Sequence, residues 1–121
     1  RVLQITIAAT LTASLTSACS STFNDKTLVY ISDGYVQCEQ PPATLAQTRN
    51  ALTQMGIKVF SSHCAQITDM SVISMCGAGG TGIHLHEIAN SDVNKATNSG
   101  FGHANTLSAQ SLNYEIIECG L

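Results

Sequence analysis

Cysteine content is the feature that most restricts how this chain folds. The 121-residue sequence carries five cysteines, and only one of them, Cys19, lies near the N-terminus. An even set of cysteines in a short chain is typical of a disulfide framework, provided that the chain leaves the reducing cytosol. We therefore expect two disulfides among the other four residues: Cys38, Cys64, Cys76 and Cys119.

Three pairings of these four cysteines are possible. We expect Cys64–Cys76, which closes a strand–loop–strand unit, and Cys38–Cys119, which joins the last strand to the first hairpin. In a chain-entropy treatment these loops stabilise the fold by roughly 3 and 4–5 kcal/mol. The sequence contains neither a C-x-x-C motif nor the spacing of a zinc site, so redox or zinc chemistry at the cysteines is not expected.

The first residues have the layout of an export signal. Arg1 precedes an apolar stretch without charges, residues 2–15, and small residues follow. A positive end, a short apolar middle and small residues before the cleavage point are typical of secretory signals. The stretch is too short and too rich in Thr and Ser for a membrane span. The competing interpretation is a buried N-terminal strand or helix of the domain itself.

Around Cys19 the sequence resembles the signal of bacterial lipoproteins. Ser17 and Ala18 precede the cysteine, as small residues do in that family, and Leu15 lies one place further away than the usual leucine. The resemblance implies that Cys19 is lipidated and becomes the mature N-terminus, which leaves four cysteines to pair. Its acyl chains would anchor the domain to a membrane. Ordinary cleavage after Ala18 is the alternative.

The sequence after the signal predicts a tether and one domain. We assign residues 1–18 to the signal peptide, 19–26 to the tether and 27–121 to a single α+β domain, because the chain is long enough for one domain only. Strands are predicted by β-branched and alternating runs, and helices by period and capping signals. The expected elements are strand 27–32, an Asp33-Gly34 turn with a returning arm at 35–38, helix 39–56, strands 57–64, 72–76 and 83–88, helix 90–100, and strand 113–119.

This order favours an α+β fold in which an antiparallel sheet carries two helices on one face. The βαββαβ arrangement of ferredoxin-like domains, here stabilised by disulfides, is the expected topology. The competing architecture treats residues 27–38 and 72–88 as β-hairpins, with about five or six strands and one helix. The first helix should pack through the residues that recur every three or four positions: Leu45, Thr48, Leu52 and Met55.

Residues 76–82, CGAGGTG, match the G-x-G-x-x-G pattern at Gly77, Gly79 and Gly82. A dinucleotide-binding loop also needs a helix directly after the glycines and an acidic residue about 20 positions further on. Residues 83–88 alternate as a strand does, and the acid is missing. Nucleotide binding is therefore not expected, and we predict a wide turn or bulge between two strand segments.

Two histidines are the candidate metal ligands. His84 and His86 lie two residues apart on an expected strand, so both side chains point to one face, with Cα atoms roughly 6.5 Å apart. Two imidazoles so placed can share a zinc or copper ion. A complete site needs a further ligand, and the remaining histidines are His63 and His103.

In the competing interpretation Ile83 and Leu85 occupy the core face of this strand, and the histidine pair lies on the solvent side. The neighbours His63 and Cys64 would point to opposite faces of their own strand, so a Cys/His nucleophile pair is not expected there.

Motifs of serine hydrolases, zinc proteases and β-lactamases are absent. The sequence thus indicates no catalytic residues.

Charge and composition limit the partners. The net charge is -3, with five Lys plus Arg and no Trp, so binding to nucleic acid is not expected. The sequence predicts an exported, lipid-anchored domain of the cell envelope that has a non-catalytic binding or structural role toward an envelope protein or ligand and needs no cofactor. The alternative is a periplasmic metal-binding domain that uses His84 and His86. A third possibility, a small enzyme or inhibitor acting through loop 98–110, is supported only by the length and composition of that loop.

Overall fold

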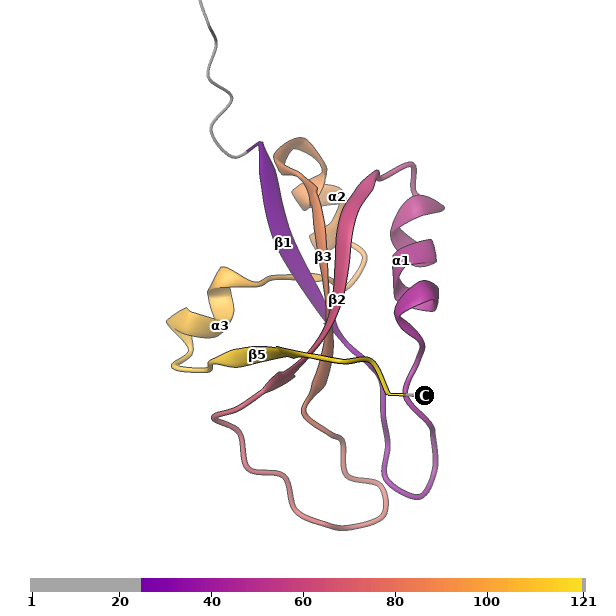
Figure 1. Cartoon of the computed structure of the whole chain (residues 1–121), viewed down its shortest axis with the longest axis vertical. Coiled ribbons are helices and arrows are strands. Elements are labelled where there is room, and N and C mark those ends of the chain that lie inside the picture. The colour runs from indigo at the N-terminus through magenta and orange to yellow at the C-terminus, as the bar shows by residue number, and fades with distance from the viewer. Residues whose placement is uncertain (1–24, 121) are drawn as a thin grey trace, which may run out of the picture.

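The computed structural model describes residues 25–120 (Figure 1). The predicted signal peptide, Cys19 and most of the tether therefore lie outside the described residues. None of the helices in the described range is long and apolar enough to cross a membrane. The elements are β1 (Lys26–Ser32), α1 (Leu45–Thr53), β2 (Val59–Ile67), β3 (Gly82–Ala89), the 3-10 turn η1 (Asn90–Asp92), α2 (Val93–Thr97), β4 (Gly102–His103), α3 (Asn105–Ala109) and β5 (Tyr114–Ile117).

The strands form one five-stranded sheet in the order β4-β1-β3-β2-β5. β3 is the central strand, and it pairs antiparallel with β1 on one side and with β2 on the other. β4 extends the sheet beyond β1, and β5 extends it beyond β2, again antiparallel. The predicted α+β class and antiparallel sheet are thus confirmed.

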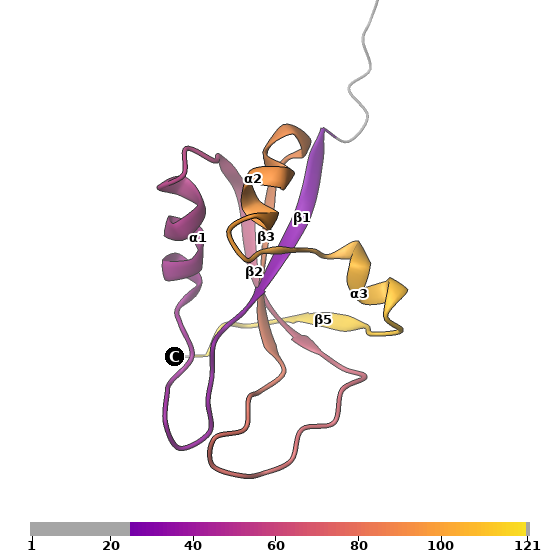
Figure 2. The same ribbon diagram turned by 180° about the vertical axis from the view of Figure 1, so that it is seen from behind.

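Both faces of the sheet are covered. α1 and α2 contribute Leu52 and Ala96 to one apolar cluster, which also contains Val29 of β1. α3 contributes Leu107 to a second cluster, which contains Leu85 of β3. α3 lies beside β5, away from α1 and α2, in both views of the ribbon (Figures 1 and 2). Because side chains alternate along a strand, β3 is buried on its two faces at once.

α1 is shorter than the predicted helix 39–56. The Thr44 hydroxyl accepts a hydrogen bond from the Gln47 backbone N–H, and the Gln47 side chain accepts one from the Thr44 N–H, which forms a capping box at the helix start. The prolines just before it disfavour the helical conformation in the residues that precede them. Thr48 and Leu52 are buried toward the sheet, as their spacing predicts.

The segment between β2 and β3 is a long loop, and the strand predicted at residues 72–76 is wrong. The apolar run there has no strand to pair with, since β3 takes the place beside β2 and β5 takes its other edge. The arm predicted at 35–38 is not a sheet strand either, because Val36 makes only isolated bridges with Gln40 and Gly79. A strand does follow the glycines, as expected, since Gly82 begins β3.

Two disulfides are present, but their connectivity differs from the expected one. The bonds are Cys38–Cys76 and Cys64–Cys119, with Cα–Cα distances of 5.0 and 5.2 Å. Because residues 72–76 are not a strand beside β2, Cys76 is not brought to Cys64. Instead β5 pairs with β2, and Ile117 lies opposite Cys64. Cys119 follows two residues after Ile117 and is thereby placed beside Cys64. The two bonds overlap along the sequence.

Candidate functional site

His84 and His86 project from β3 toward α1 and are buried, with 4% and 0% of their surface exposed. The expectation that they lie on the solvent side is therefore wrong. Ile83 and Leu85 are buried on the opposite face, as predicted. The reason is that both faces of the sheet are covered at β3, and α1 packs on the face that carries the two histidines.

Thr48 of α1 joins the two histidines. Its hydroxyl lies 2.9 Å from Nδ1 of His84 and 2.8 Å from Nε2 of His86, and it donates to the Leu45 carbonyl at 3.2 Å. Nδ1 of His86 lies 2.7 Å from the Ser62 hydroxyl of β2. One hydrogen assignment satisfies all four contacts: both imidazoles are neutral and donate to Thr48, and Ser62 donates to His86.

This environment favours neutral imidazoles. Burial, followed by the neighbouring His84 and the Arg49 guanidinium, lowers the pKa of His86 to about 4. Burial also lowers the pKa of His84, and the Asp33 carboxylate partly opposes that effect. Burying a charged imidazolium costs free energy because it loses its water shell. At these two histidines the neighbouring charges do not offset that cost, so the neutral form is favoured.

The geometry does not assemble a metal site from the predicted ligands. The nitrogens of His84 and His86 that face each other both bond to Thr48, and their ring centroids are 6.4 Å apart. His63 is exposed and lies opposite Leu85, on the other face of the sheet. His103 lies on β4, beyond β1. In the part of the chain that the structure describes, three or more His, Cys, Asp or Glu side chains do not gather as metal ligands.

A cleft of about 590 Å³ lies beside His84, between the segment that enters α1 and the sheet. Its wall includes Asp33, His84, Ile117 and the disulfide of Cys64 and Cys119. In the pairing of β2 with β3, Cys64 lies directly opposite His84, so the two side chains share a face. This contact could not be predicted from the sequence, because the two residues are brought together only by the register of β2 and β3.

Asp33 is held at the rim of this cleft. Its carboxylate accepts a hydrogen bond from the Tyr35 N–H at 2.9 Å, and its own N–H donates to the Gly82 carbonyl at 3.1 Å. A Cβ at position 82 would lie 2.0 Å from Oδ2 of Asp33, so only glycine leaves room for the carboxylate. The glycine pattern thus has a packing role at this position.

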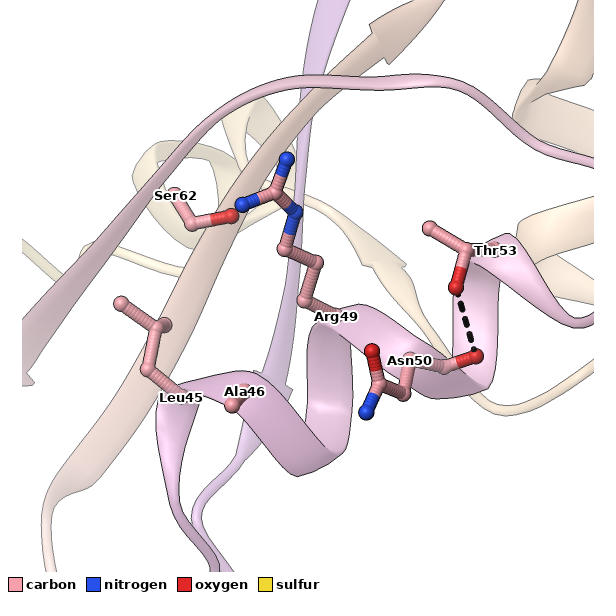
Figure 3. A pocket seen from close by; sticks show the side chains of 6 residues that line it. All are labelled: Leu45, Ala46, Arg49, Asn50, Thr53 and Ser62. Carbon is pink, nitrogen blue, oxygen red and sulfur yellow. Dashed lines mark hydrogen bonds between the residues drawn. The ribbon is translucent and has the colours of Figure 1, made fainter.

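A second hollow, of about 490 Å³, lies between α1 and β2. Arg49 extends across it from α1 toward Ser62 of β2, and Asn50 and Thr53 lie further along the helix (Figure 3). Arg49 is the single cationic side chain that lines it. One exposed guanidinium does not define a ligand, so we assign this hollow no role.

Exposed large apolar side chains gather at one end of the molecule, in residues 34–40 and 69–81, which we name the two-loop end. Ile73 and Met75 are 65% and 59% exposed. The other large apolar side chains exposed there are Tyr35, Met70 and Val72. This surface is not predicted from the sequence, because residues 72–76 are expected to form a strand.

The two loops are tied together, so this surface has a defined shape. The Cys38–Cys76 bond links them. The Gln37 side chain donates to the carbonyls of Ile73 and Gly79 at 3.0 and 3.2 Å and accepts from the Met75 N–H at 3.1 Å. These bonds hold the two loops against each other although neither forms a helix or a strand.

Comparison with known proteins adds no family assignment. No family model, no curated protein and no solved structure matches the chain.

Proposed function

We propose that the chain is an exported, lipid-anchored domain of the cell envelope that binds a partner protein through the two-loop end and has no catalytic role there. The observation that carries this proposal is the set of exposed Met, Val, Ile and Tyr side chains on loops fixed by Cys38–Cys76. Contiguous exposed apolar surface is typical of interaction sites, and methionine adapts well to a partner surface.

Export and anchoring are supported by two observations of different kinds. The N-terminal residues resemble a lipoprotein signal up to Cys19, and the four other cysteines are paired, as expected outside the cytosol. β1 begins at the opposite end of the long axis from the two loops (Figure 1). A lipid on Cys19 would thus tether the end of the domain that lies away from the binding surface.

The charges of the two-loop end favour a protein over a membrane as the occupant. Glu39 and Asp69 are its charged residues, and it contains no Lys or Arg. An anionic membrane attracts basic surfaces and repels acidic ones. We therefore propose an apolar patch of an envelope protein, bordered by basic side chains, as the complementary surface.

We also propose that β1, α1, β2, β3, α2 and β4 form a ferredoxin-like unit, to which α3 and β5 are added. The strand order β4-β1-β3-β2 and the shared apolar cluster of α1 and α2 support this. In that description β5 extends the sheet at the β2 edge, and the Cys64–Cys119 bond fastens the addition.

Site-specific photo-crosslinking tests the binding surface. A photo-reactive residue replaces Ile73 in the full chain, made in the cells that naturally produce it, and the control position is Ile116, an equally apolar exposed residue on β5. We expect one discrete adduct from position 73, none from 116, and loss of the adduct in the Cys38→Ser/Cys76→Ser variant. Equal labelling from both positions would refute the assignment.

The anchor is tested independently. Metabolic labelling with a fatty acid, followed by mass analysis of the mature N-terminus, should find a diacylglyceryl-type addition on Cys19. The Cys19→Ala variant should lose the label. An unmodified mature terminus would remove the lipid from the proposal and leave the binding surface untouched.

A further inference from the structure

The 590 Å³ cleft carries polar groups that the binding proposal does not use. Most of its wall is apolar, with contributions from Pro41, Leu45 and Ile117. Among the described residues that line it, Asp33 and His84 are the ionisable side chains, and there is no Lys or Arg. A largely apolar cleft of this size with a few converging polar groups is the usual form of a small-ligand site. None of the described residues that line it belongs to the two-loop end, so the two surfaces are separate.

Asp33 presents one carboxylate oxygen to the cleft. Oδ1 accepts the Tyr35 N–H, whereas Oδ2 accepts no hydrogen bond from the described residues. Oδ2 occupies the place where a side chain at position 82 would begin. Because residues two apart on a strand share a face, Oδ2 lies on the same face of β3 as His84, roughly 6.5 Å along the strand. No Lys or Arg of the described chain pairs with this carboxylate, so its charge is available to a ligand.

His84 presents a hydrogen-bond acceptor to the same space. Its Nδ1 donates to Thr48, which leaves Nε2 of the neutral ring without a hydrogen. Nε2 bonds to none of the described residues, and it is not fully enclosed, because the fully buried side-chain polar atom without a partner among them is Nδ1 of His103. Burial lowers the pKa of His84 and the Asp33 carboxylate raises it, so the two groups are close enough to interact. The cleft therefore offers two acceptors and one negative charge.

We propose that this cleft binds a small primary alkylamine in its ammonium form. The N–H groups of the ammonium donate to Oδ2 of Asp33 and Nε2 of His84, and the alkyl chain lies against the apolar wall. An ammonium has three donors and no acceptor, and hydrogen bonds between ionised partners are stronger than neutral ones. An anion would meet the carboxylate and the lone pair of Nε2, so the charges disfavour it.

A metal ion fits this arrangement less well than an ammonium. Zinc takes three or four protein ligands. The described residues bring one imidazole and one carboxylate to the cleft, and three or more His, Cys, Asp or Glu side chains do not gather in that part of the chain.

Both acceptors are held in place before a ligand arrives. Thr48 fixes the ring of His84, and the Tyr35 N–H fixes the carboxylate of Asp33. Pro41 and Pro42 restrict the backbone of the wall that enters α1. Groups that are already ordered lose little conformational entropy on binding, which favours a small ligand that makes few contacts.

Nuclear magnetic resonance titration of the full, oxidised chain with hexylamine at pH 7.5 tests the proposal. We expect saturable shifts of backbone amides that are largest around Asp33, His84 and Ile117. Hexanol and hexanoate keep the alkyl chain but lack the positive charge, and they should bind at least about tenfold more weakly. Hexyltrimethylammonium keeps the charge but has no N–H, and it should also lose about tenfold in affinity.

Asp33→Asn tests the carboxylate, because an amide oxygen can still accept the Tyr35 N–H while the charge is removed. We expect the affinity for hexylamine to fall about tenfold. The matched control is Asp69→Asn, at a loop carboxylate that also accepts a backbone N–H, from Asn113, but does not line the cleft. This control should bind hexylamine as the wild type does.

His84→Asn tests the imidazole, because asparagine keeps a donor near the position of Nδ1 and has no atom at the position of Nε2. We expect the affinity for hexylamine to fall about fivefold, as the loss of one neutral acceptor predicts. His63→Asn, at an exposed histidine on the other face of the sheet, should leave the affinity unchanged.

Four results would overturn the proposal. They are the absence of saturable shifts, shifts centred outside the cleft, equal affinity in Asp33→Asn and Asp69→Asn, and binding of hexanol or hexyltrimethylammonium as tight as that of hexylamine. If His84→Asn fails to fold, the ligand series and the two aspartate variants decide alone.

Discussion

Acidification should destabilise this fold through His86. The imidazole is fully buried between β3 and α1, and its pKa in the folded state is about 4. In an unfolded chain the pKa of histidine is about 6.5. The unfolded state therefore binds a proton in a pH range where the folded state does not. The contribution of the neutral imidazole is complete above about pH 6.5 and is lost as the pH falls toward about 4.

The size of the effect follows from the two pKa values. Linkage gives a loss of about 2 kcal/mol in the free energy of unfolding between pH 7.5 and pH 5, and about 3 kcal/mol by pH 4. His84 adds to the loss in the same direction, because burial lowers its pKa as well. For a small domain this is a large part of the total stability.

Urea denaturation at pH 7.5 and pH 5 measures this loss. Carboxyl groups also titrate in acid, so the informative quantity is the difference in pH dependence between the wild type and His86→Gln. The variant is expected to lose about 2 kcal/mol less between the two pH values. His63→Gln, at an exposed histidine of β2, is the control and should behave as the wild type does. The same pH dependence in wild type and His86→Gln would refute the reasoning.

Three further predictions concern the core, the cleft and the metal alternative. Leu52→Ala, which removes a fully buried side chain of α1, should cost about 3 kcal/mol in urea denaturation, and a loss below about 1 kcal/mol would contradict the packing described. Gly82→Ala should lower the melting temperature because its methyl group displaces the Asp33 carboxylate, and Asp33→Ala should relieve part of that loss in the double variant. Zinc should leave the melting temperature of the wild type unchanged, because Thr48 already bonds both facing histidine nitrogens, and a saturable rise that is absent in His84→Ala would revive the metal hypothesis.

Local features of this fold are readable from the sequence. The three- and four-residue spacing in α1 acts within a few positions, so Thr48 and Leu52 are identified as buried. The start of this helix is predicted too early, at residue 39, because the Thr44 cap and the two prolines before it are not taken as its boundary. β1 and β3 are likewise found from their β-branched and alternating residues. β4 and α3 are not predicted, because elements of two and five residues are too short to carry a period.

Pairing between distant segments is what the sequence does not reveal. Residues 72–76 have the composition of a strand, yet no sheet edge is free to receive them beside β2. The connectivity of the cysteines depends on that same choice, so one wrong strand leads to two wrong bonds. The burial of His84 and His86 depends on β3 being central, and the opposition of Cys64 and His84 depends on register.

The overlapping order of the two disulfides has a consequence for survival among proteases. If one cut falls between residues 38 and 64 and another between 76 and 119, three fragments result. The middle fragment carries Cys64 and Cys76, and each of these is bonded to a different outer fragment. The nicked molecule therefore remains one covalent body, whereas a nested pairing, with Cys64 bonded to Cys76, would release the middle piece.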